Sequence, residues 1–462
     1  MSEPDRKPDS EEDGGYSLDR SFVDTVLQAV EQDDDALLAR LLEPVHPADI
    51  ADLMEQVGEK QRRALLRVWG EEIDGEVLSE LDDSLREEVF EEIPDEVLGE
   101  AVRELDSDDV VDLVEDLEPA QRDVLLSALD APERAAVEQA LSYPEFSAGR
   151  LMQREVVYAP EHWNVGRIID YMRSDQAEMP EQFYHVMLVD PRMRPTGYVT
   201  LGKVLASPRT HPLRSLCEDS FRTVRVTEDE GEVAYAFNQY HLISMPVVDE
   251  DDRLVGVITI DDAMAVLDHE HEEDILRLAG VSDESSLSDR VADTTRRRLP
   301  WLAVNLGTAI LASLVIAEFD AVIAQVVALA VLMPIVASMG GNAGTQSLTV
   351  AVRAIATKDL TAANIWRVLR REGLVGLING VVFALIMGGI ALLWFGSAQI
   401  GAVIALAMVI NMVIAGLAGI TIPFVLDRIG VDPALASGAF VTTVTDVVGF
   451  LAFLGLAAMV LL

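Results

Sequence analysis

Cysteine and basic residues are both scarce in this sequence. One cysteine, Cys217, occurs in 462 residues, which excludes an intramolecular disulfide and fits a reducing compartment. Only 35 Lys and Arg stand against 79 Asp and Glu, so the formal net charge is −44. A surface this acidic repels phosphate backbones and anionic lipid head groups, so we expect no nucleic-acid partner.

Two functional signals are also missing. No Gly-x-x-x-x-Gly-Lys-Ser/Thr loop or other hydrolytic signature occurs, which argues against an ATP-driven pump and against an enzyme. No apolar stretch follows a positive cluster near the N-terminus, so we expect no secretory signal. Residues 1–20 are polar and acidic, and we predict that they form a disordered tail.

The excess negative charge is confined to the N-terminal part of the chain. From residue 296 onward there are nine Lys or Arg and seven Asp or Glu, a net of +2, which leaves −46 for residues 1–295. An excess spread so widely is typical of a solvated, halophilic surface in a salt-rich cytosol. A surface that collects divalent cations is the alternative, and for that role only a few carboxylates need be ligands.

Five apolar segments follow Arg296-Arg297-Arg298, and each is long enough to cross a bilayer. They cover roughly residues 299–317, 321–339, 373–395, 400–426 and 433–462. All the basic residues of this region lie before the first segment, between the second and third, or between the fourth and fifth. This distribution predicts a multi-pass protein of the inner or plasma membrane with its N-terminal region in the cytoplasm and its C-terminus outside.

A single acidic residue, Asp446, lies near the middle of the last segment. A carboxylate at that depth costs roughly 2.5–3.5 kcal/mol on insertion scales, and such residues usually mark an ion path. No Lys or Arg occurs inside the core of any segment to neutralise it, so a cation is its natural partner. A buried structural pairing is the alternative.

The second segment contains Met333-Pro334 and, after it, the glycine- and amide-rich stretch 340–347. We expect Pro334 to interrupt the span. Backbone opened at membrane depth is tolerated only against protein or a water-filled cavity. The stretch therefore predicts either close helix packing or a pore lining.

The part before the membrane segments divides in two. Residues 21–146 carry apolar residues at three- and four-residue spacing, which predicts an all-α domain. The stretch 49–55 recurs at 109–115, an offset of 60 residues, as expected for short helices stacked into a superhelical array. A scaffold or spacer is the plainest role for such an array.

Residues 147–268 alternate short strands and helices in two similar units, and they resemble a tandem CBS pair, a module that commonly senses small ligands. In CBS units that hold adenosine nucleotides, a Gly-x-x-Thr-x-x-Asp stretch contacts the phosphate and ribose. The second unit has it as Gly256, Thr259 and Asp262, whereas the first has Lys203 in place of the Asp. The resemblance implies at most one ATP site per chain. The alternative is that these residues only end a strand and cap a helix.

The parts, in this order, resemble the MgtE family of magnesium transporters from about residue 40 onward. The stretches that carry the resemblance are 143–152, Pro246-Val247-Val248-Asp249, Glu273-Asp274-Ile275, 341–346, and 432–437 with Asp446. The implied fold is multidomain: an all-α superhelical N-terminal domain, an α/β tandem CBS pair, a connecting plug helix at 269–298, and a five-helix transmembrane domain at 299–462. The family assembles as a homodimer with its pore on the twofold axis.

The resemblance also implies a set of site residues. The family's pore carboxylate matches Asp446, and its neighbouring pore positions match Gly438 and Thr442, with Gly438 standing where relatives often have Asn. Regulatory Mg²⁺ in the family bridges acidic groups of the N-terminal domain, the CBS pair and the plug helix. The matching candidates in this sequence are Asp108, Asp112, Asp262, Glu270, Glu273 and Asp274. His241 and Ala265 replace residues that are often acidic in the family, which puts some regulatory sites in doubt.

We therefore predict a channel that moves Mg²⁺ down its electrochemical gradient into the cytosol and is closed by cytosolic Mg²⁺. A Na⁺- or H⁺-coupled divalent cation carrier is one alternative. It would need a second titratable or ion-binding group within the spans, and Asp446 is the only one that the predicted spans contain. A membrane receptor that senses ions or nucleotides without transport is the other alternative.

Overall fold

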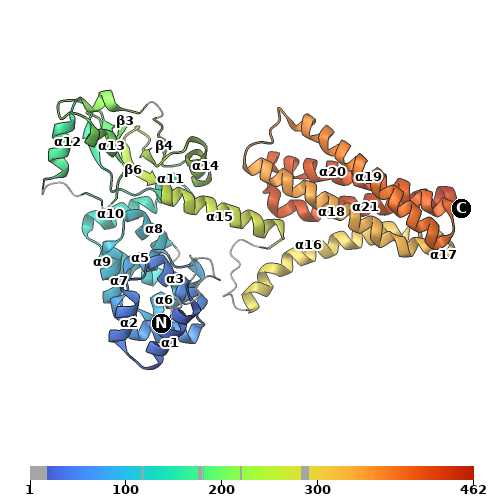
Figure 1. Ribbon diagram of the computed structural model, residues 1–462, viewed down its shortest axis with the longest axis horizontal. Helices are drawn as coiled ribbons and strands as arrows, with labels where there is room; N and C mark the ends of the chain where they lie inside the picture. The colour runs from blue at the N-terminus through green and yellow to red at the C-terminus, as the bar shows by residue number, and fades with distance from the viewer. Residues whose placement is uncertain are drawn as a thin grey trace, which may run out of the picture. The chain divides into compact units, whose positions relative to one another are not determined.

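The computed structural model describes residues 18–115, 117, 119–174, 179–180, 182–218, 221–281 and 291–462 (Figure 1). The chain forms two compact units, residues 1–268 and 269–462. Most of the predicted disordered tail, residues 1–17, lies outside the described residues.

The first part of unit 1 is a stack of short helices around one core, as predicted. The helices are α1 (Arg20–Glu31), α2 (Asp35–Leu42), α3 (Pro47–Gln56), α4 (Glu59–Trp69), η1 (Gly70–Glu72), α5 (Gly75–Ser79), α6 (Asp83–Glu92), α7 (Asp95–Ala101), η2 (Val102–Glu104), α8 (Ser107–Glu115), α9 (Pro119–Ala128) and α10 (Ala131–Ala140). The side chains of Asp19, Asp34 and Asp74 accept backbone N–H groups at helix starts, which helps to begin helices this short. Their buried apolar side chains form a single cluster from Val26 to Ala140.

The internal repeat is visible in the hydrogen bonds. Arg62 donates to the carbonyl of Met54, eight residues earlier, and Arg122 donates to the carbonyl of Val114, also eight residues earlier. The two arginines therefore have equivalent roles in the two copies of the repeat. Each donates hydrogen bonds to backbone carbonyls near the C-terminal end of the preceding helix.

The second part of unit 1 is the CBS pair. Its elements are α11 (Ala148–Leu151), β1 (Tyr158–Pro160), α12 (Val165–Met172), β2 (His185–Val189), β3 (Pro195–Thr200), α13 (Leu201–Ala206), η3 (Leu213–Leu216), β4 (Val224–Arg225), α14 (Glu230–Tyr240), β5 (Ser244–Val248), β6 (Leu254–Thr259) and α15 (Ile260–Leu278). The sheets β1-β2-β3 and β4-β5-β6 have the same topology, one parallel and one antiparallel pairing, and the same irregularity in the central strand. The two similar CBS units inferred from the sequence are thus confirmed.

Helix α15 continues across the division at residue 268 into unit 2, where α16 (Val291–Ala317) begins. Helix α15 ends at Leu278, and Gly280 follows in a left-handed conformation with φ of 72°, so the plug region predicted as one helix over 269–298 is interrupted there. Residues 282–290 lie outside the described residues.

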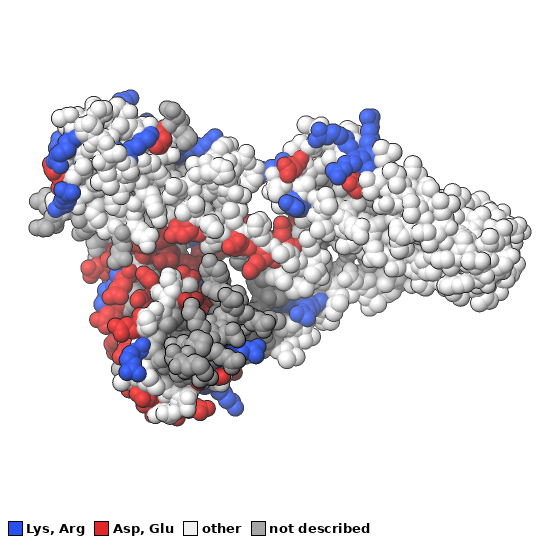
Figure 2. Space-filling view, in the orientation of Figure 1, with Lys and Arg blue, Asp and Glu red and all other residues white. Residues whose placement is uncertain are grey.

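Unit 2 continues with α17 (Asp320–Gln325), α18 (Ala328–Ala356), α19 (Ile365–Phe395), α20 (Ala398–Arg428) and α21 (Pro433–Leu461). Within the part of the chain that the structure describes, five helices, α16 and α18 to α21, are long and apolar enough to cross a membrane, which agrees in number with the five predicted spans. The second span lies at Ala328–Ala356 instead of 321–339, because α17 forms a separate short helix before it. Acidic side chains gather on the visible face of the helical part of unit 1, whereas the visible face of unit 2 is largely free of charge toward its C-terminal end (Figure 2). This uncharged surface suits the lipid-facing side of a membrane domain.

One expectation about α18 is wrong. Pro334 lies inside an unbroken helix, so the backbone is not opened at this point. A proline removes one N–H from the helical ladder, and neighbouring helices in a membrane can support the helix around it. Two residues after Pro334, the helix is tied to α20, where Asn411 Nδ2 donates to the carbonyl of Val336 over 2.9 Å.

Candidate functional site: a polar face in the membrane unit

Three predicted pore residues share one face of α21. Gly438, Thr442 and Asp446 follow each other at four-residue spacing, which aligns side chains along a helix. Thr442 is exposed and donates its hydroxyl to the carbonyl of Gly438 over 2.9 Å. Asp446 is half-buried, and it has no hydrogen bond or ion pair within the part of the chain that the structure describes. Its carboxylate is therefore available to a ligand.

The glycine-rich stretch of α18 has two faces with different roles. A Cβ atom at Gly340 would lie 2.2 Å from Asn411 Nδ2, and one at Gly344 would lie 2.7 Å from Val441 Cγ1. These glycines thus permit close packing of α18 on α20 and α21. The other face is polar and exposed, and it carries Asn342, Thr345, Gln346 and Thr349.

Both polar faces flank the same helix contact. Thr345 follows Gly344 on α18, and Thr442 and Asp446 follow the contact residues Val441 and Thr445 on α21. Polar side chains on the outside of a membrane helix are unfavourable against lipid. We therefore expect these two faces to contact water, an ion or another protein surface instead of lipid.

Glu372, a carboxylate that lies outside the predicted spans, belongs to the membrane helix α19. The apolar pattern placed the third span at 373–395, but α19 begins at Ile365. Its first two turns carry Arg367, Arg370 and Arg371, which interrupt the apolar pattern without ending the helix. Ser347 on α18 donates to Glu372 over 3.1 Å. This contact between helices could not be seen from a hydropathy pattern.

An acidic cluster forms in unit 1 where α8 approaches the start of α15. Burial raises the pKa of Asp108 well above its usual value, and the negative charge of Asp262 raises it further. Burial likewise raises the pKa of Asp109 to about 7, assisted by Asp262 and Asp106. Burial raises the pKa of Asp262 to about 6, although its hydrogen bonds from Thr259 act in the opposite direction. These groups are costly to ionise together, so a bound cation would stabilise them.

The remaining regulatory candidates lie elsewhere. Asp112 forms a 2.7 Å ion pair with Arg86 instead of joining this cluster. Glu270, Glu273 and Asp274 lie on the part of α15 that belongs to unit 2. Among the described residues no three His, Cys, Asp or Glu side chains form a ready metal site, so metal ligation by the six candidates stays a prediction.

The end of α15 contacts the start of α21 within unit 2. Arg277 pairs with Glu273 and with Asp432, whose Oδ2 lies 2.6 Å from its Nη1. Leu278 packs against the buried cluster of Leu348, Val352, Ala434 and Val441. Burial raises the pKa of Asp274, and the negative charges of Asp432 and Glu270 add to this effect. Sequence reasoning missed Asp432, Arg277, Asp106 and Asp109 as members of these groups, because only the fold brings them beside the predicted residues.

The predicted nucleotide stretch ends a strand and begins a helix. The hydroxyl and N–H of Thr259 both donate to Asp262 Oδ2, at 2.5 and 3.3 Å, at the start of α15. Gly256 is covered, because a Cβ atom there would lie 2.6 Å from Met152 Sδ. This arrangement, in which the residues end a strand and cap a helix, matches the alternative to nucleotide binding that the sequence left open. The two replaced family positions, His241 and Ala265, are exposed, and His241 ends α14 in a left-handed conformation.

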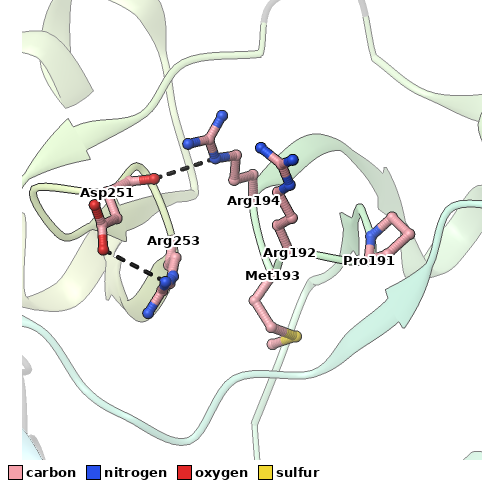
Figure 3. A pocket seen from close by; sticks show the side chains of 6 residues that line it. All are labelled: Pro191, Arg192, Met193, Arg194, Asp251 and Arg253. Carbon is pink, nitrogen blue, oxygen red and sulfur yellow. Dashed lines mark hydrogen bonds and ion pairs between the residues drawn. The ribbon is translucent and has the colours of Figure 1, made fainter.

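A cavity lies between the two hairpin turns of the CBS pair (Figure 3). It measures about 530 Å³ and is lined by Pro191, Arg192, Met193, Arg194, Asp251 and Arg253. A backbone hydrogen bond from Leu254 to Met193 ties the two turns together, and Arg194 donates to the carbonyl of Asp251. The cavity is a basic spot on an acidic protein, but its arginines are mostly exposed.

Comparison with known proteins gives the family. A model described as "Divalent cation transporter" matches residues 333–456, one for the MgtE intracellular N domain matches 45–146, and one for the CBS domain matches 213–269. The protein called magnesium transporter MgtE from Enterococcus faecalis is 34% identical over 313 residues, which cover 68% of this chain and 69% of that protein. The protein of the same description from Thermus thermophilus is 34% identical over 317 residues, 68% of this chain and 70% of that one.

Among solved structures, the cytosolic domain of the Mg²⁺ channel MgtE in complex with ATP is 29% identical. The match covers 53% of this chain and 99% of that one, with a TM-score of 0.49. The matched relatives span both the soluble and the membrane part. The chain belongs to the MgtE family of divalent cation transporters.

Proposed function

We propose that the protein is a homodimeric Mg²⁺ channel in which Asp446 of each subunit faces the twofold axis. The observation that carries the proposal is the unpaired Asp446 carboxylate on a polar face of α21, beside the polar face of α18. Relatives 34% identical to this chain are described as magnesium transporters, which supports the choice of ion.

Two facing carboxylates suit a hydrated Mg²⁺ ion. Mg²⁺ releases its waters reluctantly, so a site that holds the ion through those waters avoids the cost of stripping them. Two negative charges favour a divalent over a monovalent ion. A membrane potential of about 100 mV supplies roughly 4.6 kcal/mol for two charges, so no ATP hydrolysis is needed.

We further propose that cytosolic Mg²⁺ closes the channel by neutralising the acidic groups around α15. The raised pKa values of Asp108, Asp262 and Asp274 support this, because each belongs to a group of carboxylates that repel one another. Removing the cation would separate the groups and shift the population toward the open state. The N-terminal part would then lie in the cytoplasm and the C-terminus outside. ATP in the CBS pair remains a further proposed ligand, through Thr259 and Asp262.

Ion flux into proteoliposomes tests the proposed function. Wild-type protein should carry Mg²⁺ down an imposed Mg²⁺ gradient without a Na⁺ or H⁺ gradient, and Asp446→Asn should reduce the flux by about tenfold or more, the equivalent of about 1.4 kcal/mol. Glu318→Gln is the matched control, since Glu318 is an exposed acid between α16 and α17.

The same assay separates the alternatives. Flux that requires a Na⁺ or H⁺ gradient would identify a coupled carrier. Absence of flux in the wild type would favour a sensing receptor. An Asp446→Asn flux equal to that of the wild type would exclude Asp446 from the ion path.

A further inference from the structure

A small cavity in the membrane unit lies between α18 and α19, with α20 as its floor. Its volume is about 160 Å³, and its polar lining consists of Gln346 and Ser347 from α18 and Glu372 and Asn379 from α19. We call it the α19 cavity. Met412 and Gly416 of α20 close its base, and a Cβ atom at Gly416 would lie 3.2 Å from the carbonyl of Glu372.

Glu372 is the only acid that lines the α19 cavity. Its carboxylate accepts a hydrogen bond from Ser347 over 3.1 Å, and no basic side chain pairs with it in the part of the chain that the structure describes. Arg370 and Arg371 precede it but are exposed and make no ion pair with it. Glu372 lies within a helix that qualifies as a membrane span, where an unpaired charge is unfavourable. A cation from outside the chain would therefore stabilise this carboxylate.

We infer that the α19 cavity binds a monovalent cation, with the Glu372 carboxylate as its charged ligand. One carboxylate balances one positive charge, and the hydroxyl of Ser347 and the side-chain amides of Gln346 and Asn379 can supply neutral oxygen ligands. Mg²⁺ fits less well, because a dication beside one carboxylate would keep an uncompensated charge. A volume of about 160 Å³ leaves room for an ion and a few waters, at about 30 Å³ each.

The bound cation would link α18, which carries one of the two polar faces, to α19. Ser347 packs inside unit 2, whereas Gln346, the next residue, also belongs to the exposed polar face of α18. A cation held by α18 and α19 together would therefore fix the rotation of α18 about its axis. The direction in which its exposed polar face points would then be fixed as well. This consequence for flux rests on the proposed channel function, but the binding itself does not.

Equilibrium binding of radiolabelled Na⁺ and Rb⁺ to purified full-length protein tests the inference. The measurement uses the Asp446→Asn background, in which the pore carboxylate cannot contribute. Saturable binding of at least one of the two ions is expected, and adding Glu372→Gln should weaken it by about tenfold or more. Ser347→Ala should weaken binding by a smaller factor, and Glu318→Gln should leave it unchanged.

Thermal unfolding provides a second readout. The unfolding temperature should be higher in NaCl or KCl than in N-methylglucamine chloride at the same concentration, and Glu372→Gln should abolish the difference. If Glu372→Gln does not fold, Asn379→Ala and Ser347→Ala take its place.

Absence of saturable binding of either ion would overturn the inference. A stability that rises only on acidification, and loses that rise in Glu372→Gln, would also overturn it, because Glu372 would then be held as the neutral acid. Neither result depends on Mg²⁺ flux, so failure here and failure of the proposed channel can be told apart.

Discussion

At the residue scale, single glycines decide how closely the membrane helices approach. Gly340 and Gly341 are neighbours on α18, yet a Cβ atom at Gly340 would lie 2.2 Å from Asn411 Nδ2, whereas one at Gly341 would meet nothing within 4 Å. Asn411 is itself buried and holds the carbonyl of Val336. The first glycine is therefore required for packing and the second is not.

Gly340→Ala should lower the stability of unit 2 by about 1–3 kcal/mol through overpacking, and Gly341→Ala should change it far less. Thermal unfolding of both variants in the same detergent checks this. Equal unfolding temperatures for the two variants would show that α18 does not pack on Asn411 as described.

The acidic cluster of unit 1 predicts a pH dependence. The folded pKa values of Asp109 and Asp262 are raised to about 7 and about 6, so the folded state binds protons more tightly than the unfolded chain. In the absence of divalent ions, the stability that proton binding by these two groups contributes should therefore be fully present below about pH 4. It should be lost progressively up to about pH 7. The unfolding temperature of unit 1 in chelator should fall over this range.

Asp109→Asn should flatten this profile, and Mg²⁺ should raise the unfolding temperature more at pH 8 than at pH 5. Asp190→Asn is the matched control, because hydrogen bonds from Arg194 and Arg192 lower the pKa of Asp190 instead. A wild-type profile in chelator that rises between pH 5 and 7 would contradict the burial of these acids.

The site residues differ in how far the sequence predicts them. Asp446 could be found because an isolated acid inside an apolar segment is visible in one dimension. Glu372 was missed because it adjoins charged residues at the helix start, and only its contact with Ser347 shows that it points between helices. The grouping of Asp106 and Asp109 with Asp262 joins residues about 150 positions apart, which local patterns cannot register.

At the element scale, α15 is the helix that the proposed gating mechanism depends on. Its first turns carry Asp262 in unit 1, and its last turn carries Arg277 and Leu278, which contact the start of α21 in unit 2. Arg277 is the positive charge that the structure places among Glu273, Asp274 and Asp432. Without it these carboxylates would repel one another.

Arg277→Gln should therefore loosen the end of α15 and raise Mg²⁺ flux at a cytosolic Mg²⁺ concentration that closes the wild type. The proteoliposome assay measures this directly. Arg225→Gln is a suitable control, because Arg225 makes an exposed ion pair with Asp252 in unit 1. Flux in Arg277→Gln no higher than in the wild type would remove α15 from the gate.

The number of membrane-spanning helices and the two CBS units were predicted well, because five long apolar segments and two similar strand patterns are strong signals. The course of the second span was not. Pro334 was expected to interrupt the span, but α18 stays helical through it and packs closely on α20 and α21 in the turns that follow. Tertiary packing of this kind overrides a local helix-breaking preference.

At the scale of the whole molecule, the charge of −44 sets the conditions in which the protein is stable. Self-repulsion among surface carboxylates weakens the folded state, and salt screens it over about 3 Å at 1 M instead of about 10 Å at 0.1 M. The unfolding temperature should rise as KCl increases from about 0.1 M toward about 1 M. Sucrose is the control for solvent exclusion without screening, and it should have a smaller effect. A fall with KCl would contradict a halophilic surface.

The proposed pore requires that two Asp446 side chains meet at the dimer axis. The chain offers a direct test, because its only cysteine, Cys217, can be replaced by serine. Asp446→Cys in that background should join two subunits when a short bifunctional thiol reagent is added, and Mg²⁺ should slow the reaction. Leu451→Cys, an exposed position on another face of α21, should not cross-link. Cross-linking at Leu451 but not at Asp446 would contradict the proposed pore.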